Sequence, residues 1–143
     1  MSLLRRRRSA AAQAELDGAV AAIDRELAAN LELTTMFDQT RQAVALENAQ
    51  FERDRAVIAR ELPDASTLVA DVYARIVAAE EAMGRRGPAG SLRDADRAII
   101  ESWEGDAREA QRVLRMAGTA APPSLWEALR RLLRGRSAHP PRR

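Results

Sequence analysis

The fold is decided by residues 15–37, which read ELDGAVAAIDRELAANLELTTMF. Four apolar side chains recur in this stretch at alternating spacings of four and three: Leu16, Val20, Ile23 and Leu27. On a helix with about 3.6 residues per turn, such spacings place the side chains in one stripe. The pattern therefore predicts a long amphipathic helix that begins near Ser9 and runs to about Phe37.

The stripe continues through Asn30 or Leu31 and then through Thr34 and Phe37. A buried Asn in a helix seam would fix the register of the packed helices. We favour the other interpretation, in which Asn30 lies at the boundary of the stripe in contact with water.

The pattern is looser between Thr34 and Leu62, where apolar residues repeat at intervals of seven: Phe37, Val44, Phe51 and Ile58. Thr34, Thr35 and Thr40 in this region lower helix propensity, so a bend or break is expected there. A helix from about Asn48 to Glu61 follows, and Leu62-Pro63 ends it because a residue before proline is disfavoured in the α conformation.

Two further helices are predicted. The first is capped by Asp64 or Ser66, ends at Gly84, and has this apolar face: Leu68 or Val69, Val72, Ile76, Ala79 and Met83. The second begins at a Ser91-x-x-Asp94 capping box and stops at Gly118. Its apolar residues are Leu92, Ala95, Ile99, Trp103, Ala110, Leu114 and Ala117. Gly18 and Gly105 lie inside helices, either at close helix crossings or as tolerated surface glycines.

These elements predict an all-α protein: an antiparallel helical bundle of three to four main helices plus a short C-terminal amphipathic helix. The chain of 143 residues is about the size of one domain. We divide it into a basic N-terminal segment (1–8), a bundle domain (9–118), a linker with a basic amphipathic helix (119–135) and a disordered basic tail (136–143).

Residue composition argues against several kinds of chemistry. The chain has no cysteine, which excludes disulfides and thiol chemistry, and its single histidine is His139 in the tail. A Ser-His-Asp triad and the inward-facing Glu-x-x-His pairs of di-iron bundles both need histidine in the fold. We therefore expect no catalytic activity, no metal site and no cofactor.

Charge is segregated along the chain. Residues 1–8 hold four Arg and no acid (+4), residues 9–118 hold thirteen Arg against twenty acids (−7), and residues 119–143 hold six Arg against one acid (+5). The body is thus acidic and both ends are basic. No stretch approaches the roughly 18 apolar residues of a membrane span, and the Arg5–Arg8 run leads into polar residues rather than a signal sequence. A cytoplasmic location is expected, including one peripheral to the inner face of the membrane.

The first candidate site is the loop Gly84–Ser91, which reads GRRGPAGS and leads into a helix N-terminus. Exposed N–H groups and positive side chains at such a position suit a phosphate or sulfate, so Arg85, Arg86 and Ser91 are candidate anion-binding residues. A plain interhelical turn is the alternative, because a Walker loop would need a preceding strand and a Gly-Lys-Ser/Thr ending.

The second candidate site is the predicted helix Ser124–Arg134. Its apolar and basic residues separate onto two faces, which fits a membrane-surface helix or a peptide that docks in a groove. The candidate partner or membrane surface consists of Leu125, Trp126, Leu129, Arg130, Arg131, Leu133 and Arg134. The alternative is that the apolar face folds back and completes the bundle. A helix this short would need a second membrane signal, which Met1–Arg8 could supply.

Two stretches resemble a group of uncharacterised bacterial all-helical proteins with a membrane-proximal bundle. They are residues 27–37 (LAANLELTTMF) and, after Leu62-Pro63, residues 68–76 (LVADVYARI). In that group a membrane-anchoring segment precedes a long helix with an Asn-Leu-x-Leu pattern. This chain departs from it because Met1–Arg8 looks only like the basic flank of such an anchor. The resemblance implies a membrane-proximal helical module and no reaction.

Taken together, these features predict a helical interaction or scaffold module that binds a protein partner or associates with itself, with no small-molecule substrate. The alternative is a peripheral binder of anionic lipid or of nucleic acid through the Arg-rich ends. Nucleic acid is the less favoured ligand, because the body is acidic and no aromatic residues alternate with the basic runs.

Overall fold

The computed structural model describes residues 8–119. Within this range the chain is all-α and contains no strand. The helices are α1 (Ala10–Thr40), α2 (Ala49–Glu61), α3 (Pro63–Ala74), α4 (Ile76–Gly84) and α5 (Asp94–Thr119), and a 3₁₀ turn, η1, spans Pro88–Gly90. The predicted fold class is confirmed.

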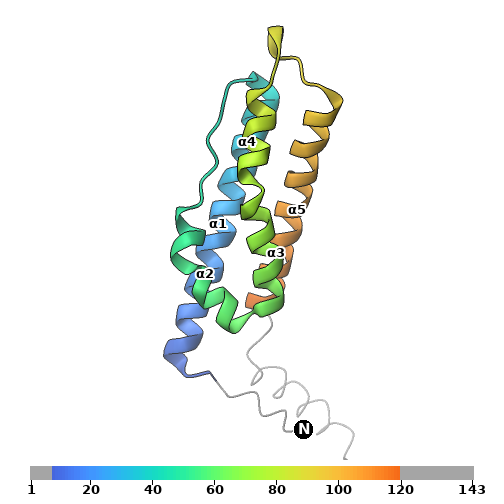
Figure 1. Ribbon diagram of the computed structural model, residues 1–143. Coiled ribbons are helices and arrows are strands. Elements are labelled where there is room, and N and C mark those ends of the chain that lie inside the picture. The colour runs from blue at the N-terminus through green and yellow to red at the C-terminus, as the bar shows by residue number, and fades with distance from the viewer. Residues whose placement is uncertain (1–7, 120–143) are drawn as a thin grey trace, which may run out of the picture.

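The helices form four antiparallel columns (Figure 1). The chain ascends in α1, returns through residues 41–48 and α2, ascends again through α3 and α4, and descends in α5. Both α1 and α3 pack against α2 and α5, so α1 and α3 stand diagonally across the bundle. Short connections between sequential elements produce this up-and-down arrangement.

Helix α1 follows its sequence pattern closely. It begins after Ser9, whose Oγ accepts a hydrogen bond from the Ala12 backbone N–H at 3.1 Å. Ile23, Leu27 and Phe37 are completely buried. The helix ends at Arg41, which has a left-handed conformation (φ 56°) and donates its backbone N–H to the Phe37 carbonyl.

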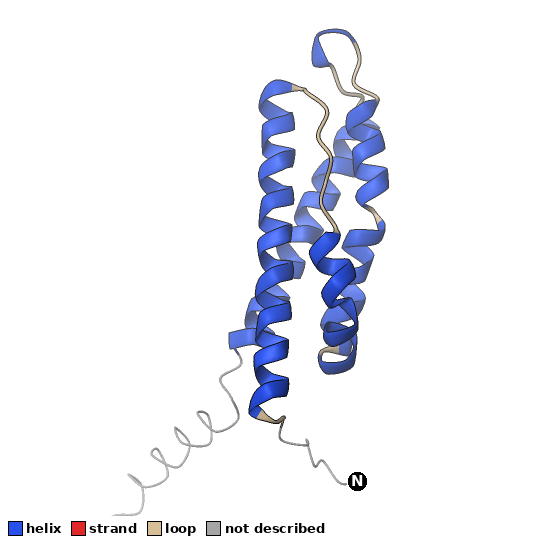
Figure 2. Ribbon diagram, turned by 90° about the vertical axis from the view of Figure 1, so that its left-hand side faces the viewer, coloured by secondary structure: helices blue, strands red, loops and turns tan. Residues whose placement is uncertain are grey.

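The second column consists of residues 41–48 followed by α2, and only its lower half, α2, is helical. Residues 41–48 run in an extended path beside the helices before α2 begins (Figure 2). Val44 and Leu46 of this segment pack against a small core cluster that includes Phe37, Met83 and Ile100. A break is therefore confirmed, but it lies at residues 41–48, after the three threonines, because α1 continues to Thr40, three residues beyond its predicted end. The predicted start of α2 is correct to within one residue.

The predicted caps of the third column are wrong. Neither Asp64 nor Ser66 caps a helix, because α3 already starts at Pro63, with Leu62 at the N-cap position and no side-chain capping bond. Proline suits the first helical position, since its missing N–H has no partner there in any case and its fixed φ fits the helix. The turn between α2 and α3 is consequently a single residue.

The third column is also two helices and not the predicted one. Arg75 leaves the helical conformation (φ −96°, ψ 3°) between α3 and α4. The Trp103 indole N–H donates to the Val72 carbonyl at 3.0 Å, three residues before this break. A side chain that donates a hydrogen bond to a backbone carbonyl within a helix is a recognised cause of a kink. The spacing of apolar residues in the sequence does not predict such a contact.

Helix α5 corrects two further expectations. Its first backbone bond runs from the Arg97 N–H to the Arg93 carbonyl, so the Ser91 capping box does not form. The buried face is rotated from the predicted stripe in the first half of the helix, where Ile100 is buried while Ala95 and Ile99 are exposed. Asp96 shares this buried face because Arg85 pairs with it.

Gly18 and Gly105 are tolerated surface glycines, since a Cβ at either position would meet no atom within 4 Å. We expect Gly18→Ala to raise the free energy of unfolding by about 0.5–1 kcal/mol, because alanine loses less backbone entropy in a helix. Urea unfolding followed by circular dichroism measures this. Gly90→Ala is the opposite control: Gly90 has φ +74° and an added Cβ would lie 2.5 Å from Arg41 Cγ, so it should destabilise. Equal shifts of both variants would contradict the assignment.

Candidate functional site

The interior of the bundle contains a carboxylate that caps a neighbouring helix. Glu26 of α1 is only 4% exposed, and its two oxygens accept the backbone N–H groups of Gln50 at 2.7 Å and Phe51 at 3.0 Å. These N–H groups belong to the first turn of α2, whose own N-cap residue, Asn48, makes no side-chain capping bond. Glu26 therefore satisfies donors that a helix start leaves free and opposes the positive end of the helix dipole.

Tyr73 lies beside this cap. Its ring stacks on Phe51 with centroids 4.2 Å apart and an interplanar angle of 11°. Burial, with the nearby Glu26 carboxylate as the second cause, raises the pKa of the Tyr73 hydroxyl. The buried hydroxyl makes no hydrogen bond of good geometry, so the ring is held mainly by its apolar contacts.

Asn30 is completely buried, which corrects the expectation of a water-facing position. Its amide Nδ2 donates to the Glu47 carbonyl at 2.8 Å, and its Oδ1 accepts the Glu47 N–H at 2.7 Å. The side chain thus pairs with an extended backbone in the way that a strand would. These two bonds fasten the segment 41–48 to α1.

A second buried carboxylate, Glu104, lies between α5 and α1. Burial is the main cause that raises its pKa, and the carboxylate of Asp38 raises it further. Arg108, at 3.6 Å, and the Thr34 hydroxyl act in the opposite direction. A carboxyl group with a raised pKa can act as a general acid, but Glu104 lies where α1 and α5 pack together.

Protonation of Glu104 is expected to stabilise the fold. Because its folded-state pKa is above the unfolded value, the folded protein binds the proton more tightly, and stability falls as pH rises through this window. Glu104→Gln should therefore melt at a higher temperature than wild type at neutral pH and at a similar temperature near pH 4. Thermal melts across this range measure the gap. A gap that is constant with pH would contradict the burial argument, and Glu32→Gln, at an exposed position of α1, is the control.

An open hollow of about 480 Å³ lies between α1 and α5. It is lined by Leu31, Arg108, Gln111, Arg112, Arg115 and Met116. Each of its three arginines contacts an acid: Arg108 lies 3.6 Å from Glu104, the Nε of Arg112 lies 2.9 Å from Glu109, and Arg115 lies 3.2 Å from Asp24. The positive charge of the hollow is therefore largely compensated by the protein itself.

The three candidate anion-binding residues have separate partners. Arg85 donates from Nε to Asp96 at 2.8 Å, an interaction that raises the Arg85 pKa. Arg86 donates to the Met83 carbonyl at 3.3 Å. Ser91 precedes α5 by three residues, and its carbonyl accepts the Gly87 N–H at 2.8 Å. These contacts join the turn to α4 and α5 or lie within it, and the anion site stays a prediction.

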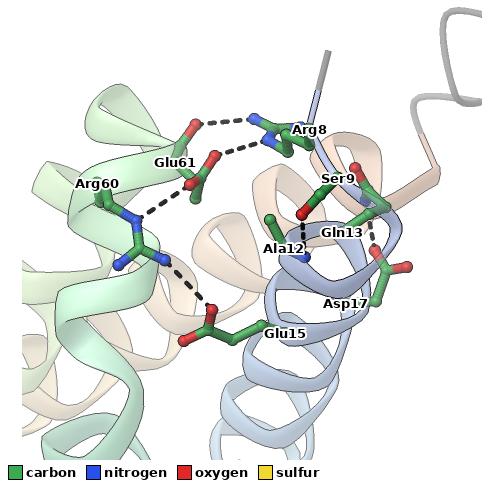
Figure 3. A network of polar contacts seen from close by, with 8 residues as sticks. All are labelled: Arg8, Ser9, Ala12, Gln13, Glu15, Asp17, Arg60 and Glu61. Atoms are coloured by element: carbon green, nitrogen blue, oxygen red, sulfur yellow. Dashed lines mark hydrogen bonds and ion pairs between the residues drawn. The ribbon is translucent and has the colours of Figure 1, made fainter. Parts of the chain in front are cut away.

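The lower end of the bundle carries a network of ion pairs (Figure 3). Arg8 holds the end of α2 through two bonds, from Nε to the Glu61 carboxylate at 2.6 Å and from Nη2 to the Glu61 carbonyl at 3.1 Å. Arg60 lies between Glu61, at 3.1 Å, and Glu15 of α1, at 3.4 Å. Arg8 and Arg60 together lower the pKa of Glu61. The network fixes the point where the chain enters the fold.

The candidate surface on Ser124–Arg134, with Trp126 and its neighbouring leucines and arginines, lies outside the described residues. Among residues 8–119, no three His, Asp or Glu side chains come together in a way that could hold a metal ion. The helices of that same range include none that is both long and apolar enough to cross a bilayer.

Sequence reasoning missed the buried polar residues Glu26, Asp96, Glu104 and Gln111. Glu26 could have been suspected, because it lies four residues before Asn30 and seven after Ala19, on the flank of the apolar stripe. For the others the spacing is equally compatible with an exposed face. Asp96 pairs with Arg85 and Gln111 donates to the Asp24 carbonyl, both from other segments, whereas the cation beside Glu104 is Arg108 of the same helix. Helical spacing within one segment does not reveal the first two partners.

The chain matches no protein-family model, and no curated protein or solved structure is significantly similar to it. The resemblance of residues 27–37 and 68–76 to membrane-proximal helical proteins therefore depends on those short motifs alone.

Proposed function

We propose that the protein is a helical interaction or scaffold module that acts by binding a macromolecular partner and not by catalysis. The observation that carries this proposal is that three buried polar side chains bond to the backbone of neighbouring segments. Glu26 caps α2, Asn30 fastens the segment 41–48, and Gln111 donates to the Asp24 carbonyl at 3.2 Å. Groups that are committed to holding the backbone are poorly placed to work on a substrate.

Size-exclusion chromatography with light scattering, over a wide concentration range, tests the self-association form of this proposal. A dimer or larger species that dissociates on dilution would support it. A monomer throughout would restrict the module to partners of another kind. An enzymatic activity that is lost in Glu104→Gln while the fold remains intact would overturn the proposal, because Glu104 is the buried carboxyl with a raised pKa.

A second candidate function is the binding of an anionic surface, lipid or nucleic acid, through the Arg-rich ends. It is favoured by one observation: the first described residues and the end of α5 lie at the same end of the bundle (Figures 1 and 2). The basic sequences 1–8 and 119–143 thus attach close together. Retention on anionic vesicles or DNA at low salt, with a steep loss as salt increases, is the expected result. No retention on either at low salt would eliminate this candidate.

A further inference from the structure

The connection between α1 and α2 lacks the helix-breaking residues that stand at the other two turns of the bundle. Residues 41–48 read RQAVALEN and contain neither glycine nor proline. By contrast, Pro63 follows α2, and the α4–α5 connection contains Gly87, Pro88 and Gly90. Arginine, glutamine, alanine, leucine and glutamate fill six of the eight positions, and all are strong helix formers. The extended conformation of this segment is therefore imposed by its surroundings and not by its own preference.

A single heptad register runs through the same connection. Seven residues of α1, the connection and α2 stand at intervals of seven: Leu16, Ile23, Asn30, Phe37, Val44, Phe51 and Ile58. All are buried except Val44, which is half-buried. Two helices that are joined by a loop have no need to share a register, whereas one continuous helix with a buried seam requires it. The spacing therefore fits a second conformation in which residues 10–61 form one helix.

The extended segment is held by few contacts. Arg41 has a left-handed backbone (φ 56°), a conformation that is unfavourable for a residue with a Cβ. Within the described range, the backbone N–H groups of residues 43–46 make no hydrogen bond. The segment is fastened by the Asn30 amide, which bonds to the Glu47 backbone, and by two half-buried apolar side chains. It is therefore a part of the fold that can open at lower cost than the helices beside it.

A continuous helix cannot form while α1 and α2 of one copy pack together. They are antiparallel neighbours in the closed fold, and a straightened connection would direct α2 away from α1 (Figure 1). The buried face of α1 would then be exposed, including Leu16, Ile23, Leu27 and Phe37. A second copy offers a surface that already fits this face, namely the place that its own α1 leaves beside α2 and α5.

We propose that residues 41–48 are a hinge through which two copies form a domain-swapped dimer, in which α1 of each copy packs against α2 and α5 of the other. This inference rests on the self-association form of the proposed function and names its mechanism. Contacts of α1 away from the hinge are remade between copies, so the two states differ mainly at the hinge. The closed state keeps the bonds of Asn30 to Glu47 and of Glu26 to the start of α2. Because the dimer needs two copies, a rising concentration favours it.

Mixed single-cysteine chains test the exchange, because the chain has no cysteine of its own. Glu15→Cys in α1 and Arg60→Cys in α2 form a suitable pair, since the two exposed side chains lie 3.4 Å apart. The two variants are unfolded in urea, refolded together at high concentration and treated with a short bismaleimide. A domain-swapped dimer places the two cysteines side by side, so a denaturing gel should show a covalent dimer.

Arg60→Cys alone is the control for this cross-link. In the domain-swapped dimer the two hinges lie at the centre and the two copies of Arg60 lie at opposite ends, so this variant should stay single on the gel. A covalent dimer from Arg60→Cys alone would indicate contact between the lower ends of two closed bundles, and would overturn the exchange.

Two hinge variants are expected to shift the equilibrium in opposite directions. Ala45→Pro blocks a helix across the hinge, and it suits the closed state because Ala45 is exposed and its N–H makes no hydrogen bond in the described range. Asn30→Leu removes the two bonds to Glu47 and adds an apolar residue to the heptad seam. We expect Ala45→Pro to weaken the dimer at least a hundredfold and Asn30→Leu to strengthen it at least tenfold. Ala45→Gln keeps a helix former at the same position and should match wild type.

Size-exclusion chromatography with light scattering, after joint refolding, measures these shifts, and circular dichroism shows whether each variant is folded. Monomers at every concentration in both wild type and Ala45→Gln would overturn the hinge and leave a module for other partners. Equal dimerisation of Ala45→Pro and Ala45→Gln would overturn it as well, and this pair is decisive even if Asn30→Leu does not fold. A dimer without cross-linking of the mixed chains would reject the exchange and leave self-association standing. The proposed function itself is tested separately, by the search for an activity that is lost in Glu104→Gln.

Discussion

Trp103→Ala is expected to lower the free energy of unfolding by about 3–5 kcal/mol, the range for removing a buried aromatic side chain. Trp103 is 1% exposed and is the largest of the fully buried side chains in the described range. Its indole N–H also donates to the Val72 carbonyl at 3.0 Å. Alanine would leave a cavity between α5 and the third column and would remove the contact that coincides with the break at Arg75.

Urea unfolding measures this loss. The unfolding is followed by circular dichroism and not by fluorescence, because the substitution itself changes the protein's tryptophan fluorescence. Trp103→Phe keeps most of the ring volume and removes the hydrogen bond, so it should cost clearly less than alanine. Ile99→Ala is a matched control on the same helix, where the side chain is 37% exposed. If Ile99→Ala destabilised the protein as much as Trp103→Ala, the assignment of the buried face of α5 would be wrong.

Helix α1 could be predicted because its pattern is local. Leu16, Val20 and Ile23 recur at helical spacing, and Ser9 is a strong N-cap. The same reasoning failed at the start of α5, where Ile99 and Ile100 stand side by side and either could face the core. The buried stripe of α5 is Ile100, Trp103, Ala107, Ala110 and Leu114, at alternating spacings of three and four, so the spacing within α5 favours Ile100. Asp96 continues this face one turn earlier, where it pairs with Arg85 of another segment.

The buried polar residues could not be predicted from the pattern within one helix. An Asn or a Glu beside an apolar stripe usually lies at its water-facing edge, since burial without a partner is costly. Asn30 and Glu26 are buried because the backbone of residues 47–51 supplies their partners. Only a tertiary structure places that backbone against α1.

The basic ends, as a candidate site, were likewise predictable only in part. The segregated charge was evident from the sequence, but the placement of both ends of the described range, residues 8 and 119, at one end of the bundle depends on the number of times that the chain crosses the bundle. Four columns place the two described ends at the same end of the bundle, whereas three would place them at opposite ends. The sequence pattern predicts three to four main helices and does not decide between them, because the pattern is loose across residues 41–48.

Glu26→Ala is expected to cost about 2–4 kcal/mol, because it leaves two N–H groups of α2 without their acceptors. Gln50 and Phe51 donate to Glu26 at 2.7 Å and 3.0 Å, and the Glu26 side chain is buried between α1 and α2. Relief of the cost of burying a carboxylate offsets part of this loss. The remainder should loosen the start of α2 and with it the stacked pair of Phe51 and Tyr73.

Urea unfolding measures the loss of stability, and amide hydrogen exchange shows where in the structure the loss occurs. In Glu26→Ala the amides of Gln50 and Phe51 should lose protection relative to those at the start of α1, where Ser9 supplies the cap. Glu26→Gln keeps one acceptor oxygen and a similar shape, so its cost should lie between wild type and alanine. Glu52→Ala removes an exposed acid from the same turn and should change little. If Glu52→Ala matched Glu26→Ala, general charge at the helix end, and not the direct cap, would explain the stability of α2.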